Sequence, residues 1–319
     1  MIIQAMDTST TSLSGIAALK NLGVIRATGE DAIKFLQGQL TQDVALMGTG
    51  ETHLAAFCNA KGRMQASFIV FKRSDDEFLM VCSADILQQT LKRLSMFVLR
   101  AKVKLLDASA DFSLFGLVGS TIDAIESIAG HARIHWSTST FEGKNTVLLY
   151  PGAGFKRALW CAPVATPPPG GVTLAPGIWE WLEVQSGIAM ITAPIFEAFV
   201  PQMLNYESVG GVNFKKGCYP GQEIVARSQF RGTLKRRAYL VHGDAAMTVG
   251  QPVFHVLDAE QPCGMVAECA AHPDGGFDAI VSMQTAAALD SDNGRLTLGS
   301  ADGTALTLLA LPYPLLEDI

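Results

Sequence analysis

The chain has 319 residues, of which 49% are hydrophobic and 17% charged, and its formal net charge is −6 at pH 7. This length favours two or three compact units, and the apolar content argues against an intrinsically disordered chain. Apolar runs are short and bounded by charges, which argues against a membrane partner, and the acidic balance argues against general nucleic-acid binding. Residues 1–15 lack the features of a secretory signal, so we expect a cytoplasmic protein.

The cysteine pattern predicts neither a disulfide framework nor a metal site. The six cysteines are scattered and include no CxxC pair: Cys58, Cys82, Cys161, Cys218, Cys263 and Cys269. Cys263, Cys269 and His272 have irregular spacing and lack a second ligand pair, so we predict no metal there. The chain also has no P-loop and no GxGxxG motif after a strand, so nothing supports nucleotide binding.

The first half of the chain alternates strands and helices. Apolar spacing predicts a helix in 29–40, and two β-prone runs around the turn Asn59–Gly62 predict a hairpin over 52–73. A strand at 77–82 leads to Ser83, a plausible N-cap for a helix over 84–94. Strands at 103–108 and 112–119 and a helix at 121–129 follow. This order favours an α+β fold of the ferredoxin-like type.

The second half begins with a hairpin pattern over 146–163 and an exposed connection near 165–175. Pro176 is expected at the first position of a helix over 177–188, and the Pro- and Gly-punctuated residues 191–214 are expected to cross the surface. From about Lys235 only short β-like runs remain, without helical patterns. We therefore expect a region 1–240 followed by a separate small β-barrel at 241–319.

Cys218 is a candidate for chemistry because of its neighbours. Lys215 and Lys216 supply cations, and residues 221–230 are expected to start a helix just after it, a setting that favours a thiolate. The alternative is a small buried side chain, since free cysteine is among the most buried residue types. No base is placed beside it by the sequence.

Two further features have both a structural and a functional interpretation. Seven basic residues lie between positions 215 and 237 against the single acid Glu223, which fits either a solvated face or a site for an anionic ligand. Trp179 and Trp181 share one predicted helix, where indoles are usually core anchors but also suit stacking on a flat heterocycle such as a pterin.

With these residues in view, the chain resembles the folate-binding YgfZ family, which is related to the aminomethyltransferase of glycine cleavage. The resemblance spans most of the chain and includes the specific signature K-G-C-Y-x-G-Q-E, here Lys216–Glu223. The other matching stretches are FLQGQLTQDV (35–44), LAAFCNAKGRMQASFIVFKR (54–73), WLEVQSGI (181–188), residues 199–237 and LPYPLLE (311–317).

The resemblance implies interwoven ferredoxin-like subdomains around a folate pocket, followed by a small barrel. It also implies binding of tetrahydrofolate or a derivative and a role in the upkeep of iron-sulfur enzymes, including those that thiolate tRNA. The signature's functional pair falls on Lys216 and Cys218, expected at or near the pocket. One folate-contacting tryptophan falls on Trp179, and the position of a second is occupied by Leu22, which removes one aromatic face.

Three functions remain open at this level. The first is a tetrahydrofolate-binding protein in which the basic segment 215–237 receives the glutamate tail of folate. The second is a folate-dependent aminomethyl or methyl transferase, although the carboxylate expected after the hairpin glycine is missing, because the residues after Gly62 read RMQASF. The third is a non-catalytic adaptor that binds tRNA or iron-sulfur assembly factors through its basic face, including Arg236 and Arg237.

Overall fold

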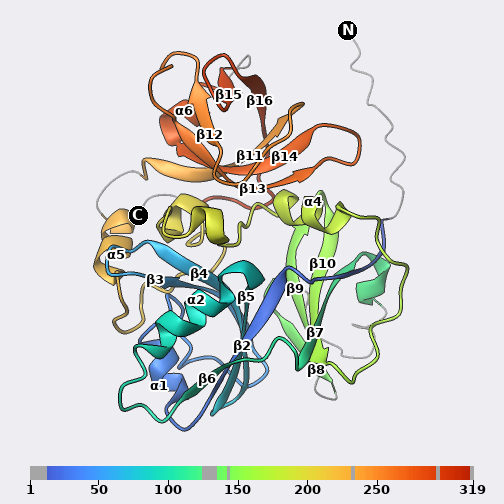
Figure 1. Ribbon diagram of the computed structural model, residues 1–319, viewed down its shortest axis with the longest axis vertical. Coiled ribbons are helices and arrows are strands. Elements are labelled where there is room, and N and C mark those ends of the chain that lie inside the picture. The colour runs from blue at the N-terminus through green and yellow to red at the C-terminus, as the bar shows by residue number, and fades with distance from the viewer. Residues whose placement is uncertain (1–12, 124–134, 142–143, 231–233, 292–294, 317–319) are drawn as a thin grey trace.

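Two five-stranded sheets and a closed six-stranded barrel make up the fold of the computed structural model (Figure 1). The structure describes residues 13–123, 135–141, 144–230, 234–291 and 295–316. Within these ranges no helix is both long enough and apolar enough to cross a bilayer. The helix expected at 121–129 lies largely outside the described residues.

The first sheet, called sheet A, brings strands from distant parts of the chain together. Its order is β1 (Gly15–Ala18), β7 (Phe112–Val118), β10 (Phe155–Pro163), β9 (Lys144–Gly152) and β8 (Thr138–Phe141), and all neighbours are antiparallel. The expected hairpin over 146–163 is therefore confirmed as β9 and β10.

The second sheet, sheet B, has the order β3 (Thr52–Cys58), β4 (Met64–Ser74), β5 (Glu77–Ser83), β2 (Leu22–Thr28) and β6 (Lys104–Asp107). Helix α1 (Ala32–Gln37) precedes β3, and α2 (Ala84–Ser95) packs on the sheet. The N-cap position of α2 is Ser83, as expected, and its Oγ donates to Asp85 Oδ1 at 2.7 Å. The turn at Asn59–Gly62 joins β3 and β4 and confirms that hairpin.

The two sheets are interwoven along the chain. Strand β1 belongs to sheet A, the next five strands build sheet B, and the chain then returns to sheet A at β7. Apolar side chains from both sheets join one buried core cluster. This confirms the expected α+β architecture of ferredoxin-like subdomains, and it leaves the junction between the sheets lined by residues from both.

Helix α4 (Ile178–Gln185) lies between sheet A and the barrel, where it packs against β9 and two barrel strands (Figure 1). The expectation that Pro176 occupies the first helical position is wrong. The N-cap is Gly177, whose φ of 82° is left-handed, and the helix starts one residue later. Pro176 therefore precedes the helix.

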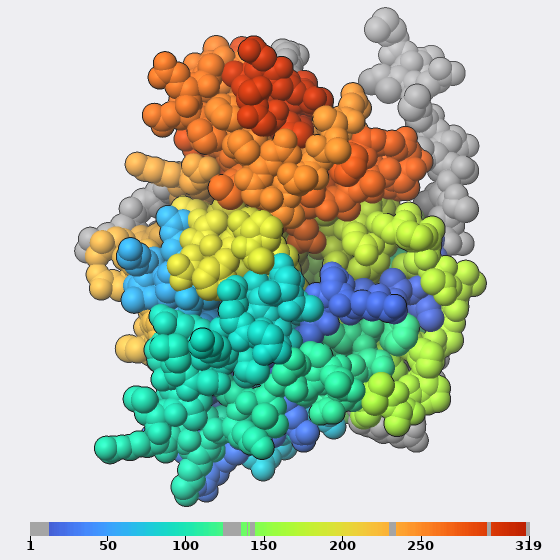
Figure 2. Space-filling model, viewed as in Figure 1, coloured from blue at the N-terminus to red at the C-terminus, as the bar shows by residue number. Residues whose placement is uncertain are grey.

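The segment 189–221 is not a surface loop, which corrects the expectation for 191–214. It contains the short 3-10 turns η1 (Ala193–Ile195) and η2 (Pro201–Leu204), and Leu204, Asn205 and Tyr206 are fully or almost fully buried. The Asn205 amide donates to Ala238 O at 2.8 Å and accepts from Ala238 N. Figure 2 shows this yellow segment filling the space between the barrel and sheet B.

The barrel closes in the order β11 (Arg236–Gly243), β14 (Phe277–Gln284), β13 (Gly264–Ala271), β12 (Pro252–His255), β15 (Leu296–Leu298) and β16 (Thr304–Leu309). Its interior forms a separate apolar cluster. The short helix α6 (Thr285–Leu289) interrupts the strands, so the expectation of no helix after Lys235 is wrong.

Candidate functional site

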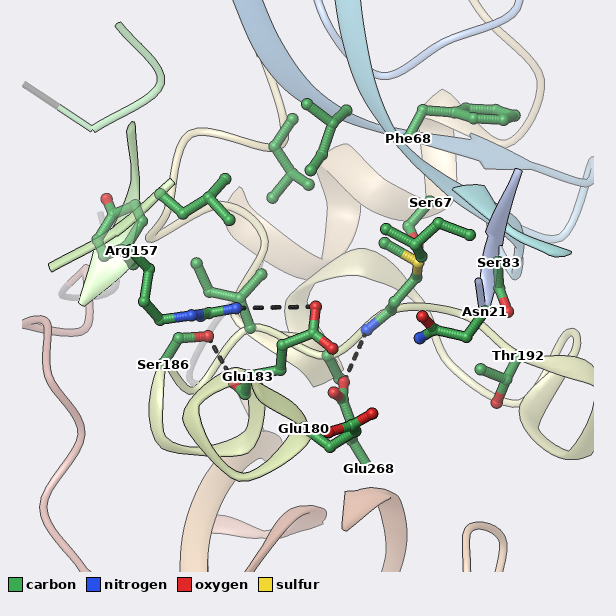
Figure 3. A pocket seen from close by; sticks show the side chains of 18 of the residues that line it. Asn21, Ser67, Phe68, Ser83, Arg157, Glu180, Glu183, Ser186, Thr192 and Glu268 are labelled. Atoms are coloured by element: carbon green, nitrogen blue, oxygen red, sulfur yellow. Dashed lines mark hydrogen bonds and ion pairs between the residues drawn. The ribbon is translucent and has the colours of Figure 1, made fainter. Parts of the chain in front are cut away.

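A cavity of about 230 Å³ lies where sheet A, sheet B, α4 and the barrel meet (Figure 3). One water molecule needs only about 15 Å³, so the space suits a larger ligand. Residues from four structural units contribute to it, including Ser67 of β4, Arg157 of β10, Glu183 of α4 and Glu268 of β13. The site therefore exists only in the assembled fold.

Buried Arg157 and half-buried Glu183 form an ion pair at one side of this cavity. Arg157 Nη2 lies 3.7 Å from Glu183 Oε1, and the arginine side chain is 3% exposed. Burial raises the pKa of the Glu183 carboxyl, and the nearby Arg157 charge opposes this rise. Burial likewise lowers the pKa of Arg157, against the attraction of Glu183. The pair therefore places a cation next to a carboxyl group in this wall of the cavity.

Trp179 supports this pair from behind and does not line the cavity. The Arg157 guanidinium lies 4.5 Å from the centroid of the indole ring. On its other side the ring packs against Gly116 of β7, where an added Cβ would come within 2.3 Å of the indole. The glycine thus permits a close approach that fixes Trp179, and the indole in turn holds Arg157.

The opposite side of the cavity presents smaller polar groups. Asn21, Ser83 and Thr192 lie together there (Figure 3). The buried Thr192 Oγ1 has no hydrogen-bond partner among the described residues, which leaves it available to a ligand. Leu22 lines this cavity and also a second one of about 370 Å³. An apolar or aromatic wall, to which Tyr150 contributes, connects the two sides.

Lys216 of the signature acts as a cap on α1. Its Nζ donates to the carbonyl oxygens of Gln37 and Leu40, each at 2.5 Å, and lies 5.0 Å from the centroid of the Tyr219 ring. Such carbonyls at a helix C-terminus favour a cation. Burial lowers the pKa of Lys216 to about 8, while the charges of Asp43 and Cys218 act to raise it.

The loop that carries Cys218 is fixed against the β3–β4 hairpin. Gly221, with φ of 80°, approaches the hairpin so closely that an added Cβ would lie 2.4 Å from Asn59 O. Helix α5 (Gln222–Phe230) then begins, as the sequence predicts. Neither Cys218 nor Lys216 lines the cavity, and α5 lies at the outer side of β3 (Figure 1).

Cys218 is expected to be the fastest thiol to react in the native protein. It is exposed, Cys269 is half-buried, and the other four cysteines are buried. Burial raises the pKa of Cys58, Cys82 and Cys161 to about 12, which lowers their reactivity further. Brief iodoacetamide treatment followed by mass spectrometry should give one adduct at this residue.

Cys218→Ser should remove that fast adduct, and unfolding in denaturant should expose all the remaining thiols to the reagent. Equally fast labelling of a buried cysteine in the native wild type would contradict the assigned exposure.

The basic segment 215–237 is mostly committed to internal contacts. Arg237 is buried and pairs with Glu207 at 2.7 Å, Arg236 donates to Cys263 O at 3.0 Å, and Arg227 pairs with Glu223 at 2.6 Å. No described residue of this segment lines the cavity. Arg231 lies outside the described residues.

A buried carboxylate joins α4 to the barrel. Asp278 of β14 is fully buried and accepts hydrogen bonds from Trp181 Nε1 and Gln185 Nε2, both at 2.7 Å. His242 Nδ1 lies 2.7 Å from the other carboxylate oxygen, and His272 Nε2 lies 4.0 Å from Asp278. Because α4 also carries Glu183, this network sets the position of one cavity wall.

Sequence reasoning missed the charged residues of the cavity. Each of these residues, Arg157, Glu183 and Glu268, lies within a mostly apolar strand or helix. A charged residue in such a position is unusual, and this is the sequence signal that could have identified them. Of the residues expected to bind folate, the structure brings Leu22 to the cavity and Trp179 behind it. Among described residues, no cluster of three or more His, Cys, Asp or Glu is arranged to hold a metal ion.

Comparisons with known proteins agree with this architecture. The family profile for the GCVT N-terminal domain matches residues 5–141. The chain is 30% identical over 247 residues to the tRNA-modifying protein YgfZ of Photorhabdus laumondii, covering 76% of this chain and 74% of that protein. It is 27% identical over 325 residues to the protein of the same name from Yersinia enterocolitica, covering 99% and 97%.

Among solved structures, the fold is similar to that of glycine cleavage system aminomethyltransferase T from Bartonella henselae. The TM-score is 0.62 at 17% identity, covering 94% of this chain and 86% of that one. At this identity the likeness concerns the fold.

Proposed function

Because the chain belongs to the YgfZ family of tRNA-modifying proteins, we propose that it binds tetrahydrofolate in the cavity that Arg157 and Glu183 line. Through this binding it supports the maintenance of iron-sulfur enzymes on which tRNA modification depends. The observation that carries the proposal is a half-buried carboxylate, paired with a buried arginine, that faces a partly apolar cavity.

The chemistry of the lining residues fits a pterin. The pyrimidine edge of a pterin presents neighbouring N–H donors, and a carboxylate such as Glu183 accepts two of them side by side. Leu22, Ile188 and Tyr150 offer apolar and aromatic surface to the rest of the ligand. Bound tetrahydrofolate would supply nitrogens that carry one-carbon units, while the protein supplies position and exclusion of water.

Lys216 and Cys218 serve a separate part of the proposed function. Lys216 holds the signature loop on α1, and Cys218 faces solvent outside the cavity. A thiol in this position suits contact with another macromolecule, such as an iron-sulfur protein or its assembly factor. We therefore propose that Cys218 acts on a partner and that Lys216 positions it.

The residues after Gly62 favour this proposal over an aminomethyl transferase. Gln65 Nε2 donates to Glu197 Oε1 at 2.6 Å, and Arg63 donates to the carbonyl of Ala198. These side chains fasten the hairpin to the segment 189–221 and do not line the cavity. Transfer chemistry needs a placed acid or base at the reacting atoms, and the hairpin does not supply one here.

Tetrahydrofolate binding is the direct test. Anaerobic calorimetric titration should show binding to the wild type and a loss of at least about tenfold in affinity for Arg157→Met, since one charged contact is worth roughly 1.5–3 kcal/mol. Trp179→Ala should also weaken binding, because the indole supports Arg157.

The matched control is Lys156→Met. Lys156 is adjacent on β10 but exposed, and it pairs with Asp123 at 2.8 Å. This variant should bind like the wild type. Thermal unfolding and circular dichroism of each variant check that it is folded. A wild-type protein that does not bind tetrahydrofolate would refute the proposed function.

A further inference from the structure

Glu268 reaches the cavity because of an irregularity in barrel strand β13. Pairing with β14 shifts between Val266, opposite Val281, and Glu268, opposite Ile280, so Ala267 is an extra residue. Val266 packs into the barrel interior, whereas Ala267 and Ala270 pack into the core outside it. Strict alternation would send Glu268 inward with Val266. The bulge reverses the alternation and turns Glu268 out into the cavity.

The two carboxyl groups of the cavity have unequal surroundings. Glu183 has the Arg157 guanidinium at 3.7 Å. Glu268 accepts a hydrogen bond from Met190 N at 3.1 Å, and no cation of the described residues lies within ion-pair distance of it. Figure 3 shows both acids on the same side of the cavity. Burial, together with the nearby charge of Glu183, raises the pKa of Glu268 to about 8.

Among the other titratable groups around Glu268, only the charge of Arg157 opposes the rise in its pKa. Arg157 is the only cation among the described residues that line the cavity, and Glu183 lies closer to it. Glu180 on α4 is an additional acid, and burial raises the pKa of Tyr150, Tyr206 and Cys269, which keeps these groups neutral at physiological pH. One cation thus faces two adjacent acids.

We propose that the cavity holds one charged and one neutral carboxyl group. Glu183 is the carboxylate that accepts from the N–H edge of the ligand, and Glu268, delivered by the barrel, donates its O–H to an acceptor on the same ligand. Two neighbouring acids in unequal environments commonly divide roles in this way. This inference rests on the proposed tetrahydrofolate site and assigns Glu268 as a ligand-contacting residue.

The test is the pH dependence of tetrahydrofolate affinity, measured anaerobically by calorimetry from pH 6 to 9. Wild-type affinity should fall about tenfold between pH 7 and pH 9, as Glu268 loses its proton. Glu268→Gln keeps an N–H donor that does not ionise, so its affinity at pH 7 should stay within about threefold of the wild type. Titration of the ligand itself affects both proteins equally. The ratio of wild-type affinity to Glu268→Gln affinity should therefore fall with pH because of Glu268 alone.

Two comparison variants separate the roles. Glu268→Ala removes the donor and should weaken binding about tenfold at pH 7. Glu183→Gln should weaken binding at every pH and move the fall in affinity to lower pH, because the Glu183 charge no longer raises the pKa of Glu268. If the wild type binds but its affinity relative to Glu268→Gln is constant with pH, the division of roles is overturned and the proposed function stands. If the wild type does not bind at any pH, both fail.

The unliganded protein gives an independent measurement. An acid whose pKa is raised by folding stabilises the protein below the ordinary pKa of 4.5 and loses this contribution as pH rises towards 8. The thermal midpoint of the wild type should therefore fall relative to Glu268→Gln between pH 5 and pH 8. Parallel profiles for the two proteins would contradict the neutral state of Glu268.

Discussion

Replacing Arg237 by Met is expected to lower the free energy of unfolding by about 3–5 kcal/mol. Arg237 joins β11 to the segment 189–221 through Glu207, whose side chain is fully buried, and it also donates to Leu316 O at 2.6 Å. Without the guanidinium, Glu207 becomes a buried acid that has lost its cation. Urea denaturation at pH 7, followed by circular dichroism, measures the loss.

The pH dependence of this loss follows from the Glu207 carboxyl. Burial raises its pKa and the charge of Arg237 opposes the rise, so the pKa is higher still in Arg237→Met. An acid whose pKa is raised by folding destabilises the folded protein as pH increases. The loss in free energy of unfolding of Arg237→Met should therefore be larger at pH 8 than at pH 5. The double variant Arg237→Met/Glu207→Gln should recover part of the loss.

Arg227→Met is the matched control, since Arg227 pairs with Glu223 at a similar distance but at the surface. Exposed pairs contribute only about 0–1 kcal/mol, so this variant should be near wild type. Equal costs for the two substitutions would show that the Arg237 pair is not buried in solution. Because Arg237 is buried, neutralising it measures its contribution to stability. It does not test whether tRNA binds to a basic surface.

Replacing Asp278 by Ala is expected to cost about 3 kcal/mol or more and to weaken ligand binding. The substitution leaves the buried N–H groups of Trp181 and Gln185 without their acceptor, and each such loss costs about 1–3 kcal/mol. Because the same helix carries Glu183, the cavity wall should loosen together with the barrel contact. Denaturation and tetrahydrofolate titration measure the two effects.

Asp274→Ala serves as the control for Asp278. Asp274 lies in the nearby β13–β14 turn and is exposed, so its removal should change neither stability nor affinity. Asp278→Asn retains one acceptor oxygen, so its stability and its affinity should lie between those of Asp278→Ala and Asp274→Ala. A variant at Asp278 that loses stability but binds tetrahydrofolate normally would show that α4 holds its place without the barrel.

Local sequence patterns predicted the elements whose signals are local. The turn at Asn59–Gly62, the N-cap position at Ser83 and the helix after Gly221 each depend on a few adjacent residues, and each is present. The segment 191–214 was expected at the surface because proline and glycine remove its periodicity. Its apolar side chains nevertheless fill the gap between sheet B and the barrel, which no local pattern reports.

The candidate site was predictable only in part, because its residues converge from separate units. Leu22 was identified through the family resemblance and lines the cavity, whereas Arg157 and Glu268 come from strands of sheet A and the barrel. Their meeting depends on how the barrel docks and on the bulge at Ala267. Lys216 is two residues from Cys218 in the sequence, yet its Nζ donates to the carbonyls of Gln37 and Leu40, at and just beyond the end of α1.

The positions of two cysteines give the protein built-in chemical reporters for its two surfaces. Cys218 is exposed on the signature loop, and Cys269 lies in the cavity lining beside Glu268. A fluorophore or cross-linker on Cys218 would therefore respond to a docking macromolecule while leaving the cavity free. Shielding of Cys269 from slow alkylation would in turn register a small molecule in the cavity, so occupancy of the two sites can be followed separately without any amino-acid substitution.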